Sequence, residues 1–139
     1  MNIAIYNFDI YQGNDDVYIL KIEEIKENDI SSNFNLTDYQ FILTIKDNAI
    51  SDPISTLSTD NGNIKLGVFD DNNVFTESDN TPYLIKIYFP HLLTEKLYAP
   101  KYKYDLFGFK PDGSREVFLR GDINVTRSIL YGKSSLRHY

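Results

Sequence analysis

The sequence predicts an all-β protein, an antiparallel β-sandwich of about seven or eight short strands with one short helical turn. Apolar and polar residues alternate along most of the chain, which is the period of a strand with one buried face. Clusters of Gly, Pro, Asn and Asp separate the alternating runs. No strand-helix-strand spacing occurs, so we expect no parallel sheet.

Alternation places most of the strands in chain order. Two β-branched and aromatic runs come first, and they alternate less regularly than the later ones. A short apolar pair, Val74 and Phe75, lies between two polar turns. Gly121 interrupts the last run, where it predicts a bulge or a close approach of another backbone segment. In full, the predicted strands cover 3–11, 16–25, 39–46, 63–69, 83–89, 101–109 and 116–125.

Turn chemistry sets the boundaries of these strands. The strongest signal is Lys110-Pro111-Asp112-Gly113, in which the proline fixes the first corner and the glycine supplies a positive φ. This turn should close a hairpin between 101–109 and 116–125. Polar turns are also predicted at 12–15 and 60–63. The one helical pattern, 91–97, follows Pro90 and ends before Pro100, so it should form one or two turns.

The alternation also predicts which side chains form the core. Residues on one face of each central strand are large and apolar, whereas their neighbours are polar. We therefore expect Phe41, Leu43, Ile45, Ile85, Ile87, Tyr104, Leu106 and Leu119 to be buried.

Composition excludes several classes of protein. The chain has 139 residues, the size of one domain, and it contains no cysteine for a disulfide, a thiol nucleophile or a thiolate metal site. Its formal charge of −6 argues against binding nucleic acid or an anionic membrane. It has no signal-peptide pattern and no apolar run of the ~20 residues that a membrane helix needs. We expect a soluble protein made in the cytoplasm.

Charge divides the chain into an acidic body and a basic end. Residues 1–114 hold 18 acids and 9 bases, whereas residues 115–139 hold 2 acids and 5 bases. We predict one sandwich domain over 1–126 and a C-terminal extension over 127–139 that binds a partner. Cations would steer the contact and apolar side chains would anchor it. The predicted partner-binding residues are Arg127, Leu130, Tyr131, Lys133, Leu136, Arg137 and Tyr139.

The sequence assigns no residue to catalysis, a cofactor or a metal. His91 and His138 lack the spacing of metal ligands, and His91 is expected at the surface or as a cap of the helical turn. The acidic run 70–73 superficially resembles a calcium loop. It lacks the glycine of an EF-hand, which favours a polar turn. The tripeptide 120–122 matches an adhesion motif by chance and lies within a predicted strand.

The order of these signals resembles a family of small β-sandwich modules from tailed bacteriophages, which includes the N-terminal domain of the upper baseplate protein. The best match is Tyr102-Lys103-Tyr104-Asp105-Leu106. Two positions depart from the family pattern, because Asp38 and Pro100 stand where the family usually has glycine. The resemblance covers roughly 8–127 and includes the turn at 12–15, the segments 36–41 and 92–97, Pro111-Asp112-Gly113 and the closing stretch 119–125.

The resemblance implies an immunoglobulin-like or baseplate-type sandwich and a non-enzymatic structural role in a phage virion. Such a protein would dock on larger tail, baseplate or capsid subunits as an adaptor or decoration module. Its partners would be other virion structural proteins or further copies of itself, without nucleic acid, membrane or cofactor. No catalytic residue is implied by the resemblance.

Two other functions stay open at this point. Exposed aromatic rings gathered on one sheet face would favour a module that binds carbohydrate at the host surface. Two close carboxylates in a deep cleft would favour a small carboxylate-dependent hydrolase.

Overall fold

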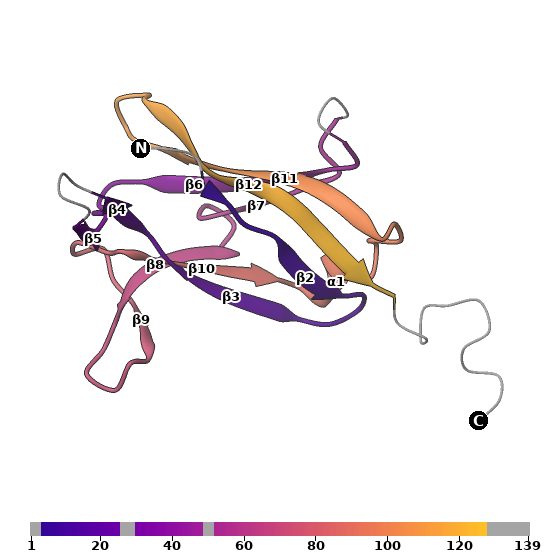
Figure 1. Ribbon diagram of the computed structural model, residues 1–139, viewed down its shortest axis with the longest axis horizontal. Coiled ribbons are helices and arrows are strands. Elements are labelled where there is room, and N and C mark those ends of the chain that lie inside the picture. The colour runs from indigo at the N-terminus through magenta and orange to yellow at the C-terminus, as the bar shows by residue number, and fades with distance from the viewer. Residues whose placement is uncertain (1–3, 26–29, 49–51, 128–139) are drawn as a thin grey trace.

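The computed structural model describes residues 4–25, 30–48 and 52–127. Within these residues the protein is mostly β, with two main sheets packed face to face (Figure 1). The predicted β-sandwich architecture is therefore confirmed at this level. The helix in this part of the chain, α1 (His91–Thr94), has four residues, far too few to cross a membrane.

The larger sheet has six strands and contains both ends of the described chain. Its order is β1-β12-β11-β6-β7, and β2 also pairs with β12. The alternation at 39–46 correctly predicted β6, but no signal predicted β7. The bounds are β1 (Ala4–Ile5), β2 (Phe8–Tyr11), β6 (Gln40–Lys46), β7 (Ser55–Ser58), β11 (Lys101–Phe109) and β12 (Arg115–Thr126).

The smaller sheet has four strands in the order β3-β10-β8-β9. A third pair, β4 with β5, forms a separate two-stranded ribbon. The short apolar pair at 74–75 marks the start of β9, which pairs only with β8 in the described chain. The bounds are β3 (Asp16–Lys21), β4 (Glu23–Ile25), β5 (Ser31–Asn33), β8 (Ile64–Phe69), β9 (Phe75–Glu77) and β10 (Leu84–Phe89).

The predicted hairpin between β11 and β12 is confirmed. The two strands pair antiparallel over their whole shared length. Gly113 has a φ of 89°, and its N–H donates to the carbonyl of Lys110 at 2.9 Å. The side chain of Asp112 also stabilises the turn, because its Oδ1 accepts a hydrogen bond from the Ser114 N–H at 2.9 Å.

The prediction of purely antiparallel pairing is wrong. Both β1 and β2 run parallel to β12, with Ile5 opposite Arg120 and Ile10 opposite Val125. Parallel neighbours in a sheet are usually joined by one crossover segment. Here the chain between β2 and β12 instead forms the rest of the sandwich before it returns to pair with the N-terminal strands. Gly121 permits this approach, because a Cβ there would overlap the carbonyl oxygen of Tyr6. The close-approach alternative for Gly121 is therefore confirmed.

The bulge of β12 lies three residues before the glycine, at Phe118. Leu106 pairs with Leu119 and Phe107 pairs with Val117, so Phe118 is the extra residue. The bulge turns the Phe118 ring inward, where it is fully buried. Val117 alternates with Leu119, Ile123 and Val125 in the sequence, but it is only half-buried, whereas those three are buried. Its place in the core is taken by Phe118, because the bulge shifts the alternation by one residue.

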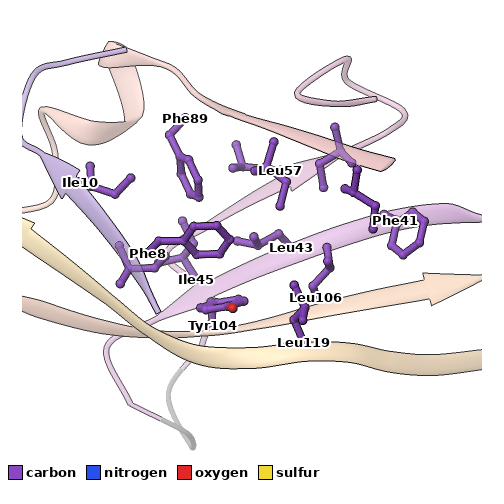
Figure 2. Packing of buried hydrophobic residues seen from close by; sticks show 14 of the residues in the cluster. Phe8, Ile10, Phe41, Leu43, Ile45, Leu57, Phe89, Tyr104, Leu106 and Leu119 are labelled. Carbon is purple, nitrogen blue, oxygen red and sulfur yellow. The ribbon is translucent and has the colours of Figure 1, made fainter. Parts of the chain in front are cut away.

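The core lies between the two sheets (Figure 2). All eight residues predicted to be buried are buried, none more than 6% exposed. Phe8 lies at the centre of an aromatic cluster, with its ring 5.2 Å from Phe89 and 5.0 Å from Tyr104 between centroids. A second cluster surrounds Phe118. Aromatic side chains therefore supply much of the apolar packing that holds the sheets together.

The segment 12–15 crosses between the sheets and packs on α1. Gln12 Nε2 donates to the carbonyl of Glu95 at 3.2 Å, and Thr94 Oγ1 donates to the carbonyl of Asn14 at 2.7 Å. Because both Gln12 and Thr94 are buried, these bonds satisfy polar groups inside the end of the sandwich. The helical segment predicted at 91–97 is confirmed, although α1 itself ends at Thr94.

Candidate functional site

The predicted partner-binding extension is described only at its first residue. Arg127 follows β12 directly and is exposed. Its neighbour Thr126 ends the strand and pairs with Tyr11, so the chain leaves the sandwich at the surface. The remaining predicted residues, Leu130, Tyr131, Lys133, Leu136, Arg137 and Tyr139, lie outside the described residues.

His91 begins α1 and is exposed, so the prediction that it lies at the surface is confirmed. His91 Nδ1 lies 3.0 Å from Asp15 Oδ1, and the His91 backbone N–H donates to the same oxygen at 2.7 Å. Tyr88 also donates to that oxygen, at 2.9 Å. The pKa of Asp15 is lowered, first by the His91 backbone N–H and then by the Tyr88 hydroxyl. This cluster joins α1 to the 12–15 segment.

The acidic run that superficially resembles a calcium loop forms a polar turn, as predicted. Asp70 Oδ1 accepts the backbone N–H groups of Asn72 and Val74, at 2.8 Å and 3.0 Å. Asn73 has a positive φ of 59°, which its short polar side chain tolerates. No group of three or more residues in the described ranges is arranged to hold a metal. The run closes the hairpin between β8 and β9.

A hollow of about 530 Å³ lies on the outer face of the larger sheet. It is lined by residues of β6, β11 and β12, and Ile5 of β1 also contributes to the lining. Ile5 is 78% exposed, although it is a large apolar residue. We refer to this site as the outer hollow. Its lining comprises Ile5, Asn7, Thr44, Lys46, Lys103, Tyr104, Asp105, Arg120, Gly121 and Asp122.

Strand register arranges the charges of the outer hollow in two rows. In one row Lys103 lies opposite Lys46 on one side and Asp122 on the other. In the second row Asp105 lies between Thr44 and Arg120. The alternation of the strands explains both rows, because every second residue on neighbouring strands points to the same face.

Ion pairs engage both carboxylates of the outer hollow. Lys103 Nζ donates to Asp122 Oδ1, Lys101 lies 3.7 Å from the other oxygen of Asp122, and Arg120 Nε lies 3.7 Å from Asp105 Oδ1. The hydrogen bond from Lys103 is the main cause of the lowered pKa of Asp122. No described residue pairs with Lys46, which faces another cation across the strands.

The outer hollow therefore has the chemistry of a binding surface. It presents three cations and two carboxylates among its lining residues. A carboxylic acid that donates a proton needs a raised pKa, whereas the pKa of Asp122 is lowered. The tripeptide 120–122 contributes two of these charged groups as part of β12, where both are ion-paired.

Sequence reasoning missed the outer hollow. The alternation indicated that Lys46 and Lys103 point outward from their own strands. It did not show that β6, β11 and β12 are neighbours, because strand order depends on contacts that are distant in the sequence. The pairing of Lys103 with Lys46, and hence the unpaired charge, could be found only once the register was known.

No family model matches the chain, and no curated protein is significantly similar to it.

Proposed function

We propose that the protein is a non-enzymatic structural protein of a tailed-phage virion, which docks on larger tail, baseplate or capsid subunits. The observation that carries this proposal is the backbone at Asp38. Asp38 has a φ of 67°, a conformation that glycine adopts most easily. The phage modules that the sequence resembles usually have glycine at this position. The positive φ at Asp38 thus supports the resemblance, because the backbone keeps the conformation of the family's glycine although the residue is an aspartate.

The proposal includes an immunoglobulin-like strand topology. In such folds the second, fifth and fourth strands form one sheet, and the third, sixth and seventh form the other. If β3, β6, β8, β10, β11 and β12 are the second to seventh strands, the observed orders β3-β10-β8 and β12-β11-β6 match this arrangement. Tyr102, near the start of β11, accepts the Ala99 N–H at 3.0 Å, as a tyrosine corner would.

The charged groups support a binding role over the hydrolase alternative. Where the described carboxylates have clearly shifted pKa values, at Asp15, Asp112 and Asp122, the shift is downward. Groups held as anions stabilise salt bridges and turns, but they are poor proton donors at neutral pH. Within the described part of the chain, the four aromatic residues among the exposed large side chains, Tyr6, Tyr11, Phe69 and Tyr98, come from different segments, which supports a sugar-binding platform less well.

The decisive experiment is mass spectrometry of particles of the phage that encodes this chain, purified with and without their tails. We expect the protein in intact particles at a fixed ratio to the major structural subunits. A protein that is absent from washed particles but retained on host cell-wall glycans would contradict the structural role and support the carbohydrate-binding alternative.

A test of the predicted extension can use the same particles. A chain that ends at Ser128 keeps every described residue, so we expect it to fold normally and to fail to enter particles. A chain carrying Arg115→Glu, an exposed charge change at the opposite end of β12 from the extension, is the control. Incorporation of the shortened chain at wild-type occupancy would contradict the role of the extension.

A further inference from the structure

The β8–β9 hairpin extends away from the rest of the smaller sheet (Figure 1). Between Phe69 and Glu77 it carries three acids, Asp70, Asp71 and Glu77, and no base. At its tip Val74 is 57% exposed beside the polar turn. Glu77 forms an ion pair with Lys65 of β8, so the tip of the hairpin presents Val74 beside the carboxylates of Asp70 and Asp71.

The hairpin is also well ordered internally. Asp70 N–H donates to the carbonyl of Val74 at 2.9 Å, and the carbonyl of Asp70 accepts the N–H of Asn73 at 3.0 Å. The ring of Phe75 covers Gly67, where a Cβ would lie 2.8 Å from it. A hairpin fixed in this way loses little conformational entropy when it binds.

The outer hollow has the complementary properties. Lys46 and Lys103 lie directly opposite each other, an arrangement that is unfavourable unless an anion lies nearby. Asp122 already forms ion pairs with both Lys101 and Lys103, and Lys46 has no partner among the described residues. Ile5, the exposed apolar residue of the lining, lies on β1, which β12 and β11 separate from Lys46 on β6. An occupant that brings an anion to Lys46 would supply the partner that this lysine lacks among the described residues.

From this complementarity we infer that the β8–β9 hairpin of one copy docks in the outer hollow of a second copy, with Asp71 facing Lys46. The inference rests on the proposed function and names a partner for it. Asp71 is exposed and has no hydrogen bond or ion pair with the described residues, so its carboxylate is available to a neighbour. Val74 would contact the lining of the outer hollow beside this charge pair.

The two surfaces cannot meet within one copy. The outer hollow lies on the outer face of the larger sheet, whereas the hairpin belongs to the smaller sheet on the other side of the core (Figure 1). The contact is therefore head-to-tail, with different surfaces on the two partners. Such a contact repeats from copy to copy and gives a ring if it closes or a filament if it does not.

A single contact of this size should be weak. Stable protein interfaces bury about 1,600 Å² in total, and one hairpin tip buries less than that. In an assembled array many such contacts act together, which raises the overall affinity without new chemistry. Free protein should therefore associate only at high concentration, and association should weaken as salt screens the charges.

The test is analytical ultracentrifugation of the full chain, from about 10 µM to about 1 mM at low salt, a range suited to a weak interface. We expect reversible self-association that declines between about 0.05 M and about 0.5 M salt. Lys46→Glu and Asp71→Lys should each weaken the association about tenfold or more, because each places like charges together. The matched controls Lys96→Glu and Asp60→Lys change the same charges at other exposed positions and should leave it unchanged.

Mixing the two variants gives the sharpest outcome. In the mixture a wild-type hollow on the Asp71→Lys chain meets a wild-type hairpin on the Lys46→Glu chain, so association should return although neither variant associates alone. A wild-type chain that stays monomeric to about 1 mM would overturn the inference, as would single variants that associate like wild type. A phage protein found in particles yet monomeric in solution would overturn this inference and leave the proposed function standing.

Discussion

The β11–β12 and β8–β9 hairpins have similar turns but differ in what surrounds them. An aspartate oxygen accepts backbone N–H groups at both, from Ser114 at the β11–β12 turn and from Asn72 and Val74 at the β8–β9 turn. The β11–β12 strands supply buried residues from Tyr102 to Val125, whereas the β8–β9 strands supply the buried Ile64 and the partly buried Leu66. The comparison shows that turn chemistry closes a hairpin, while burial decides whether it holds the fold or remains available for contact.

Removing an aromatic ring from each hairpin should show most clearly how differently the two hairpins contribute to stability. Phe118 is fully buried in β12, so Phe118→Ala should lower the free energy of unfolding by about 3–5 kcal/mol. Phe69→Ala removes the same ring from β8, where it is 38% exposed, and should lower it by about 1 kcal/mol or less. Urea denaturation of the two variants measures both effects. Equal losses would show that β8–β9 supports the fold as strongly as β11–β12 does.

Two glycines allow the same steric test in both regions. A Cβ at Gly121 would overlap the carbonyl of Tyr6, and a Cβ at Gly67 would overlap the carbonyl of Thr76. We expect Gly121→Ala to cost about 1–3 kcal/mol of global stability, because it separates β12 from the N-terminal strands. Gly67→Ala should instead detach β9 locally, with faster hydrogen exchange in β9 and little change in the global transition. Global unfolding of the Gly67 variant to the same extent would refute the distinction.

The β11–β12 hairpin was predictable because its local sequence signals agree. The Pro-Asp-Gly turn and the alternation on both sides of it point to one register, and Tyr104 and Leu106 are buried as expected. The bulge at Phe118 was not predictable, since it exists only relative to the partner strand. The parallel pairing of Ile5 with Arg120 was also not predictable from the sequence, because it joins segments more than a hundred residues apart.

The candidate site illustrates the same limit. Its charges are readable from the sequence as outward positions of separate strands. Their meeting in one hollow follows from the order of β6, β11 and β12, which long-range packing determines. The acidic turn at Asp70 was readable, since Asx-type turns are local. Its projection from the sheet was not, because exposure depends on what the rest of the chain leaves uncovered.

Alkaline pH should lower the free energy of unfolding by a smaller amount, through a hydrogen bond to the β11–β12 hairpin. The Tyr39 hydroxyl donates to Glu116 of β12 at 2.9 Å, and burial together with this bond raises the pKa of Tyr39 to about 12. Because the folded state holds the proton more tightly, this contribution is complete below pH of about 10 and is lost as pH rises through about 12. Absorbance at 295 nm and urea midpoints across this range should show it. Tyr39→Phe should flatten the dependence, and an unchanged slope would contradict the assignment.

The smallest effect on stability is expected at the tip of the short hairpin. Val74 is 57% exposed and lies outside the core, so Val74→Ala should change the free energy of unfolding by less than about 0.5 kcal/mol. Its effect on self-association should be larger, because Val74 is the apolar contact of the proposed docking surface. Urea denaturation and ultracentrifugation of one preparation measure the two quantities together. A destabilised variant would mean that the tip packs within its own copy, whereas a stable variant with unchanged association would remove Val74 from the contact and leave only the charges to hold it.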